Sequence, residues 1–152
     1  MSKRKLFLFS GHGGSDAGAI AFDGRREADL TCDLADEIEA QLRYLLDVHD
    51  TTLDESHWTL ADCIAHLNKH AQPEDLCIEL HFNHNHPTAT GTEAFVHRNT
   101  TPENAAFASQ LTATVADVLR IRNRGVKTEE QSARGRIGIL HTRPRVVLLE
   151  VC

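Results

Sequence analysis

Apolar residues recur along the chain at two different spacings, which together predict alternating helices and strands. Helical periodicity, with apolar positions three or four residues apart, runs through about 27–46, 59–70 and 102–119. Short apolar or alternating runs predict strands at 5–9, 76–82, 92–97, 137–141 and 146–151, with a weaker edge strand at 47–52. Strands that alternate with helices indicate an α/β layered sheet.

Length and composition are those of one ordinary domain. A chain of 152 residues buries roughly 68–70% of the surface that its unfolded form exposes, so a single core suffices. We find no repeats and no interdomain linker, and we expect one domain over residues 1–152. No apolar run approaches the roughly 20 residues that a membrane helix needs, so we expect no membrane insertion.

The charge pattern argues against nucleic acid as a partner. The formal net charge is -6 and aromatic residues are sparse, whereas a nucleic-acid reader usually carries a basic stripe and stacking aromatics. The basic segment 2–5 and the apolar segment 6–9 faintly imitate a secretion signal, but the apolar part is too short. We expect a chain that is made in the cytoplasm without an export signal of its own.

The four cysteines do not form a recognisable metal or redox motif. Cys32, Cys63, Cys77 and Cys152 show no Cys-x-x-Cys spacing. Buried free thiols are the simpler interpretation, and disulfides or metal ligation are the alternative.

Polar residues stand where several predicted strands and one helix meet. His12 follows the first strand, His81 closes the central strand, and Glu150 lies near the end of the last. Glu27 opens the first helix, after a glycine-rich turn that lacks the phosphate-loop pattern. Sites in open α/β sheets gather beyond the carboxyl ends of strands, so these four side chains can share one crevice. We expect Asp16 to stabilise the turn rather than to take part in catalysis.

These residue types suit a zinc hydrolase. Two imidazoles and a carboxylate, here His12, His81 and Glu27, are a known catalytic zinc set that leaves the fourth position for water. A carboxylate that does not bind the metal must then move a proton, and Glu150 is the candidate, because a charge in an apolar strand is costly unless it is paired or functional.

Structural alternatives stay open for each residue. Glu27 is favoured at a helix start by the dipole alone, His81 could be a satisfied strand histidine, and Glu150 could be a buried salt-bridge partner. His84 and His86 are rival ligands or loop residues near the cleft.

Short segments, in order along nearly the whole chain, resemble the zinc-dependent N-acetylmuramoyl-L-alanine amidases of the amidase-3 type. The segments are Gly11-His12-Gly13-Gly14-Ser15-Asp16-Ala17-Gly18-Ala19, Glu27-Ala28-Asp29-Leu30, Ile78-Glu79-Leu80-His81-Phe82-Asn83, Gly91-Thr92-Glu93-Ala94-Phe95-Val96, and Arg124-Gly125-Val126-Lys127 with Val147-Leu148-Leu149-Glu150-Val151. The resemblance implies zinc held by His12, Glu27 and His81, with Glu150 as the catalytic glutamate. It implies a twisted, mostly parallel (mixed) sheet of about six strands with helices on both faces.

The resemblance also implies a substrate, peptidoglycan or a muropeptide, cut at the amide between N-acetylmuramic acid and L-alanine. Phe9-Ser10 stands where the family often has Asp-Pro, and the family's Thr-Arg-containing strand is not evident near Val48. The expected setting is a phage lysis enzyme (an endolysin) acting on the bacterial cell wall, or a bacterial wall-remodelling amidase. A catalytically silent peptidoglycan-binding domain and an amidohydrolase for another N-acyl amino compound are the alternative functions.

Overall fold

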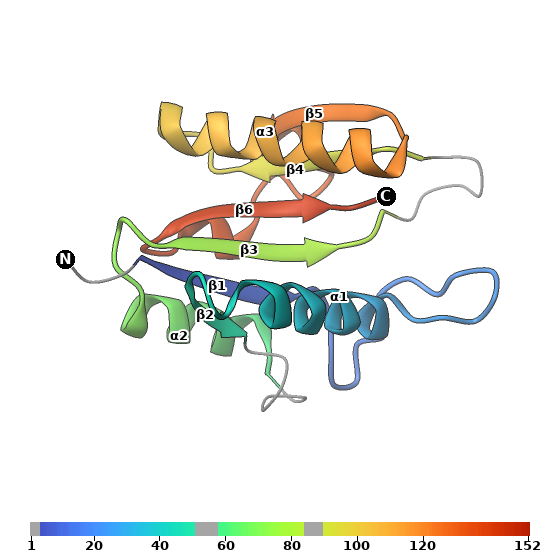
Figure 1. Cartoon of the computed structure of the whole chain (residues 1–152), viewed down its shortest axis with the longest axis horizontal. Coiled ribbons are helices and arrows are strands. Elements are labelled where there is room, and N and C mark those ends of the chain that lie inside the picture. Colours follow the sequence, from blue (N-terminus) through green and yellow to red (C-terminus); the bar gives the residue numbers. More distant parts are fainter. Residues whose placement is uncertain (1–3, 51–57, 84–89) are drawn as a thin grey trace.

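The computed structural model describes residues 4–50, 58–83 and 90–152 as a sheet with helices on both sides (Figure 1). The strands are β1 (Lys5–Ser10), β2 (Asp47–Asp50), β3 (Leu76–His81), β4 (Thr92–Val96), β5 (Asn123–Thr128) and β6 (Arg145–Glu150). The helices are α1 (Glu27–Leu42), α2 (Leu60–His70) and α3 (Pro102–Leu119), with the short 3₁₀ helices η1 (Glu129–Gln131) and η2 (Gly138–His141).

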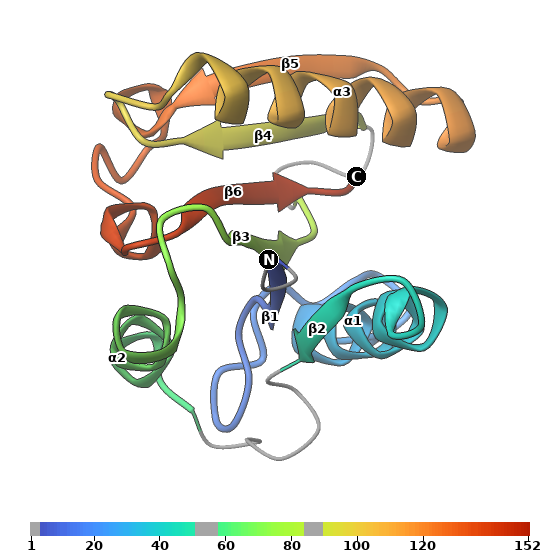
Figure 2. The same ribbon diagram turned by 60° about the vertical axis from the view of Figure 1, so that its left-hand side comes forward.

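The sheet is mixed and mostly parallel, as expected. Its strand order is β2-β1-β3-β6-β4-β5. The strands β2, β1, β3 and β6 run parallel to one another, whereas β4 pairs antiparallel with β6 and parallel with β5. Figure 2 shows the arrows of β4 and β6 pointing in opposite directions. The carboxyl ends of β1, β3 and β6 therefore share one end of the sheet, and the carboxyl end of β4 lies at the other.

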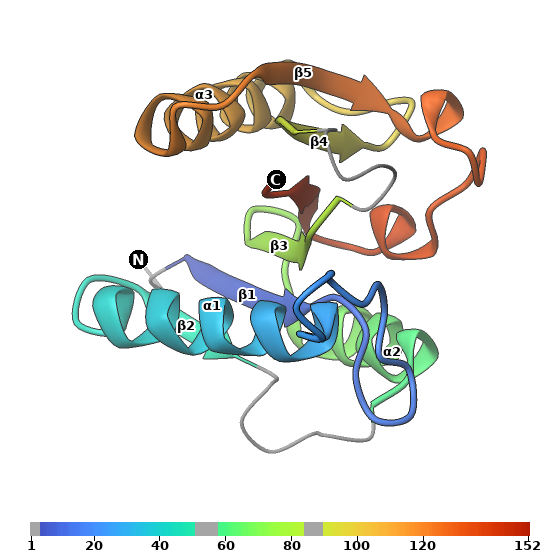
Figure 3. The same ribbon diagram turned by 90° about the vertical axis from the view of Figure 1, so that its right-hand side faces the viewer.

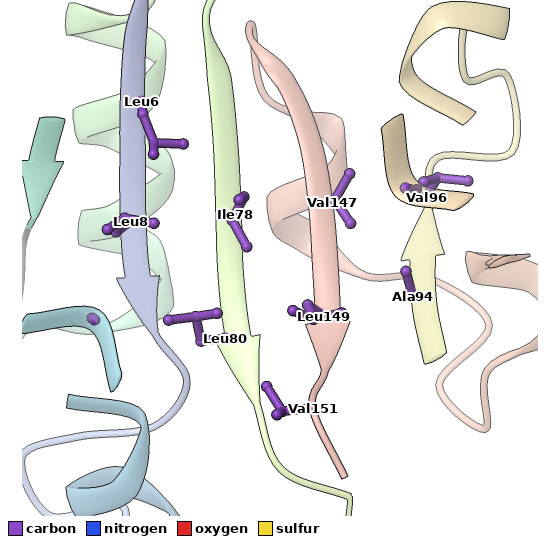
Figure 4. Packing of buried hydrophobic residues seen from close by; sticks show 11 residues of the cluster. Leu6, Leu8, Ile78, Leu80, Ala94, Val96, Val147, Leu149 and Val151 are labelled. Carbon is purple, nitrogen blue, oxygen red and sulfur yellow. The ribbon is translucent and has the colours of Figure 1, made fainter. Parts of the chain in front are cut away.

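Alternate residues of the central strands build two cores, one on each face. The helices α1 and α3 cover one face and α2 lies on the other (Figure 3). Under α1 and α3 lies an aliphatic cluster that includes Leu8, Ile78 and Val147, which Figure 4 shows side by side on β1, β3 and β6. The opposite cluster contains Phe7, Phe9 and residues of α2 and η2. Because side chains alternate along a strand, β1, β3, β4 and β6 each contribute to both cores.

Local sequence accounts for where the helices begin. Thr59 and Asp62 form a reciprocal capping box at α2, and the side chain of Thr101 accepts the N–H of Asn104 at α3. The helix α1 has no side-chain cap. Its first N–H groups donate instead to backbone carbonyls of the glycine-rich turn, from Glu27 to Ala19 (2.8 Å) among others. The turn and the start of α1 are therefore one unit.

Two predictions about strands are wrong. Residues 137–141 do not form a strand, because Ile139 and Leu140 are both buried and η2 turns these neighbours to the same side. The strand that was not predicted from the sequence is β5. Its residues Arg124, Gly125 and Lys127 lack strand character, and it forms as an edge strand beside β4. The weak strand at 47–52 is confirmed as β2 over its described residues. None of the helices in the described ranges is long and apolar enough to cross a bilayer.

Candidate functional site

The structure brings His12, Glu27 and His81 together at the carboxyl ends of β1 and β3. The Glu27 carboxylate lies between the two imidazole rings: Oε2 is 3.2 Å from Nε2 of His12, and Oε1 is 3.1 Å from Nδ1 of His81. The ring centroids are 5.1 Å apart and nearly perpendicular. One nitrogen or oxygen from each residue lies within 4.8 Å of the others. The predicted cluster of three potential ligands is thus present in the fold.

Two glycines make this approach possible. A Cβ at Gly11 would lie 2.4 Å from Cε1 of His81, and a Cβ at Gly18 would lie 2.6 Å from Cδ2 of His12 and 2.8 Å from Oε2 of Glu27. Gly18 also has a φ of +63°, and His12 itself has a φ of +66°, which is uncommon for a residue with a side chain. The glycine-rich turn therefore allows three polar side chains to approach one another closely.

Outer contacts fix the three side chains. Nδ1 of His12 lies 2.9 Å from Oδ2 of Asp16, and because a carboxylate only accepts, the ring donates from Nδ1. Nε2 faces the carboxylate of Glu27 and donates to it when the ring is protonated; it is also the nitrogen that a metal ion would take. The other oxygen of Asp16 accepts the N–H of Gly18 (3.0 Å). Asp16 thus stabilises the turn, as predicted, and also orients His12.

Glu27 is itself held by two backbone groups. The N–H of Ala19 donates to Oε2 (3.0 Å) and the N–H of Phe82 donates to Oε1 (3.0 Å). Burial alone would raise the pKa of Glu27, but hydrogen bonds from His12, His81 and these N–H groups outweigh it and keep the pKa well below its usual value. A carboxylate that is 6% exposed is therefore ionised in the middle of the site.

The two imidazoles respond to the acidic residues around them. Hydrogen bonding to Glu27 raises the pKa of His12, against burial. Burial alone would lower the pKa of His81, but Glu27 and Glu79 raise it to about 10. Oε2 of Glu79 lies 3.7 Å from Nε2 of His81, which is an ion-pair distance and too long for a hydrogen bond. In the metal-free chain, protons occupy the ring nitrogens of His12 and His81 that a divalent metal ion would bind.

Glu150 lies beside His81 in the sheet. The two are register partners in the parallel pair β3–β6, and Glu150 is also opposite Glu93 in the antiparallel pair β4–β6. Burial raises the pKa of Glu150, with further contributions from Glu27, Glu93 and Glu79, whereas His81 lowers it. The carboxyl group thus stays near the His–Glu–His cluster and holds a proton more readily than an ordinary glutamate.

An ion-pair network borders Glu150 on its β4 side. The buried carboxylate of Glu93 lies 2.9 Å from Nη2 of Arg124 and also pairs with Lys127. Nδ2 of Asn83 donates to the same carboxylate (3.3 Å). These contacts give Glu93 and Asn83 structural roles beside Glu150. The sequence did not assign partners to Arg124 and Lys127, because their edge strand β5 was not recognised.

A shallow hollow opens next to Glu27. It is lined by residues of the turn and α1 and by the two residues after His81: Ala19, Ala21, Arg25, Glu27, Leu30, Phe82 and Asn83. The hollow adjoins one side of the cluster, because Glu27 is part of its lining. The rival ligands His84 and His86 lie outside the described residues.

A second group of His97, Glu129 and His141 meets the same distance criterion elsewhere in the fold. None of its three residues was predicted from the sequence to belong to a site. These residues are 32 and 12 positions apart and stand in no motif, so only the folded arrangement reveals them.

Comparison with known proteins finds a family model that matches most of the chain and solved structures that share its fold. The model of the family described as N-acetylmuramoyl-L-alanine amidase matches residues 6–152. The Bacillus subtilis (strain 168) protein YqiI is 26% identical over 129 residues, which are 84% of this chain and 61% of that protein. The chain thus spans less than two thirds of that relative.

Solved structures share the architecture. An N-acetylmuramoyl-L-alanine amidase from Clostridium difficile 630 superposes with a TM-score of 0.82 at 24% identity, covering 97% of this chain and 78% of the other. The catalytic domain of CwlV, an amidase of the same name from Bacillus (Paenibacillus) polymyxa var. colistinus, gives 0.80 at 23% identity, covering 97% and 79%. At these identities the superpositions show that the fold is shared.

Proposed function

Since the chain belongs to the N-acetylmuramoyl-L-alanine amidase family, we propose that it hydrolyses the amide bond between N-acetylmuramic acid and the L-alanine of peptidoglycan stem peptides. We further propose that it does so with a zinc ion held by His12, Glu27 and His81. The observation that carries the proposal is the Glu27 carboxylate between two imidazole nitrogens, at 3.1 and 3.2 Å, with Glu150 in register beside His81.

The donor set fits zinc in type and in spacing. Two imidazoles and a carboxylate form a common catalytic zinc set, and donors about 2.0–2.1 Å from a tetrahedral ion lie roughly 3.3 Å from one another. The two nitrogen–oxygen distances to Glu27 are close to that value. The approach also depends on the missing Cβ atoms of Gly11 and Gly18, which suits a site built for closely spaced ligands. When bound, zinc supplies Lewis acidity that activates water and polarises a carbonyl.

Each outer residue has a role in this proposal. Asp16 holds His12 in the tautomer with a free Nε2 lone pair, and outer partners of this kind strengthen metal sites. Glu150 accepts the proton of the attacking water and passes it to the nitrogen of L-alanine as the carbon–nitrogen bond breaks. Its raised pKa suits both steps, because the group must hold the proton between them.

The substrate follows from the family, and the site is compatible with it. The hollow beside Glu27 adjoins the proposed ligands, and its wall includes Arg25, a cation that is paired with Asp23 (2.7 Å). Action on the bacterial cell wall and a phage lysis setting stay predictions.

Incubation with purified muropeptides tests the proposal. The zinc-loaded chain should release a stem peptide with a free L-alanine amine, and His81→Ala should release none. His70→Ala, which removes an exposed histidine of α2 instead, should retain turnover. Intact muropeptide after confirmed zinc loading would show that this activity is absent; stoichiometric retention of the muropeptide would then indicate a binding domain.

A further inference from the structure

The group of His97, Glu129 and His141 lies at the end of the sheet opposite to the proposed active site. His97 directly follows β4, Glu129 opens η1 after β5, and His141 ends η2 before β6. Because β4 runs against β6, its carboxyl end points away from the end that carries His81 and Glu150 (Figure 2). The two groups therefore share no residue and no loop.

Both imidazoles of this group face a single carboxylate. Nε2 of His141 lies 2.8 Å from Oε2 of Glu129, and Nε2 of His97 lies 3.7 Å from Oε1. The two ring centroids are 4.5 Å apart and nearly perpendicular. These donor distances bracket the roughly 3.3 Å expected around a tetrahedral zinc ion.

Glu129 is a buried charge, and one of its two carboxylate oxygens makes no hydrogen bond within the described residues. The residue is 1% exposed, and its Oε2 accepts the N–H of Ile137 (2.9 Å) as well as facing His141. Oε1 has no hydrogen-bond partner among the described residues, although the N–H of Arg98 faces the carboxylate. A buried carboxylate usually has its acceptors satisfied. Oε1 lies 3.7 Å from Nε2 of His97, an ion-pair distance that is too long for a hydrogen bond and leaves room for an ion between the two atoms.

We propose that His97, Glu129 and His141 bind one divalent transition-metal ion, with zinc as the best match to two imidazoles and a carboxylate. The ligating atoms are Nε2 of both histidines and the carboxylate of Glu129. The ion would contact Oε1 of Glu129, the oxygen without a hydrogen bond. It would link the segment after β4, the start of η1 and the end of η2.

One contact competes with this ion. The N–H of Asn99 donates to Nδ1 of His97 (3.0 Å), which leaves the ring proton on Nε2. Binding through Nε2 moves that proton to Nδ1 and releases the N–H of Asn99 to water, which can reach this exposed residue. We therefore expect this site to bind zinc more weakly than the site at His12, where Asp16 already holds the required tautomer.

Zinc binding measured by equilibrium dialysis against buffered free zinc tests the proposal. The wild-type chain should take up two ions in two steps, and His97→Gln should lose the weaker step. The double variant His12→Gln/His81→Gln should lose the tighter step and keep the weaker. His70→Gln is the matched control and should keep both. The proposal is wrong if His97→Gln and the wild type give the same isotherm; the group is then an ion pair only.

Limited proteolysis gives a second readout that does not depend on activity. Arg134 and Arg136 are exposed in the segment between η1 and η2 that the ion would hold at both ends. Zinc should slow tryptic cleavage there in the His12→Gln/His81→Gln variant, and should not slow it when His97→Gln is added. Equal protection in both variants would contradict the proposed ligands, whatever the outcome of the muropeptide assay.

Discussion

Two groups of two histidines and one glutamate stand at opposite ends of the same sheet, and they differ in the contacts that surround the histidines and the glutamate. At His12 the outer carboxylate of Asp16 takes the Nδ1 proton, whereas at His97 the N–H of Asn99 occupies Nδ1 and forces the proton onto Nε2. The first group also has the in-register neighbour Glu150 with its raised pKa. We found no comparable acid beside the second group within the described residues.

The surroundings of the two groups differ more than their ligand types. Glycines without side chains, a strained His12 and a carboxyl group that holds a proton suit the first group to the proposed reaction. The second group lies between short 3₁₀ turns and holds a buried carboxylate, which suits stabilisation of a loop.

The largest effect is expected at Glu150, the carboxyl group that lies beside the first group. Glu150→Gln should lower turnover of muropeptides by about 10²–10⁴-fold, because the amide cannot move the proton. Zinc content should not change, since Glu150 is not among the proposed ligands. Glu74→Gln, an exposed change in the turn before β3, is the matched control. Equal activity of Glu150→Gln and the wild type would remove the basis of the contrast.

The next effect concerns the metal-free chain. The pKa of His81 is raised to about 10 by Glu27 and Glu79 despite burial, so the folded state binds its proton more tightly than the unfolded state, whose pKa is near 6.5. This stabilisation is complete below about pH 6.5 and is lost as the pH rises through about 10. The urea midpoint of chelator-treated protein should therefore fall over that range.

His81→Gln is the control for this pH dependence. The variant should show a smaller fall, because Gln has no proton to lose. A fall of the same size in both proteins would assign it to other groups.

A moderate effect is expected where the two groups hold their tautomers differently. Asp16→Asn should weaken zinc binding at the first site by roughly 10–100-fold, because His12 loses the acceptor that fixes its ring. Asp23→Asn removes a carboxylate of the same turn that pairs only with Arg25 in the described contacts, and should leave the affinity unchanged. Equal affinities for Asp16→Asn and the wild type would mean that the outer contact is not used.

The smallest effect is expected at the second group. His141→Ala should lower the free energy of unfolding of the metal-free chain by about 1–3 kcal/mol, because the buried carboxylate of Glu129 no longer accepts a hydrogen bond from the ring N–H. Turnover of muropeptides should be unchanged at temperatures where the variant is folded. Urea denaturation and the muropeptide assay measure the two separately. Lost turnover in a chain of unchanged stability would give the second group a catalytic role.

The predictability of the fold depended on whether local pattern and tertiary packing agreed. The helix at 102–119 was predicted to the residue, because Pro102 and an apolar stripe mark it locally. The segment at 137–141 reads as an apolar strand, but its packing against α2 buries Ile139 and Leu140 together in a turn. The strand β5 is charged and carries a glycine, and only its pairing with β4 makes it a strand.

The candidate site was partly visible in the sequence for a related reason. His12, Glu27, His81 and Glu150 stand at the ends of recognisable elements, so their convergence follows from parallel strands. The orientation of His12 by Asp16 depends on an uncommon backbone conformation that no spacing reveals. Glu129 and its two histidines meet only because β4 is reversed, and that reversal has no local signal.

The reversed strand also has a practical consequence for anyone who wishes to immobilise this protein. Attachment through a cysteine introduced at the exposed Arg134, with the exposed Cys152 replaced by serine, would tether the molecule by the end of the sheet remote from Glu150. The hollow beside Glu27 would then face outward, toward the proposed substrate peptidoglycan, an insoluble polymer that does not diffuse to the protein. Strand direction thus sets which side of the molecule can be fixed to a solid support.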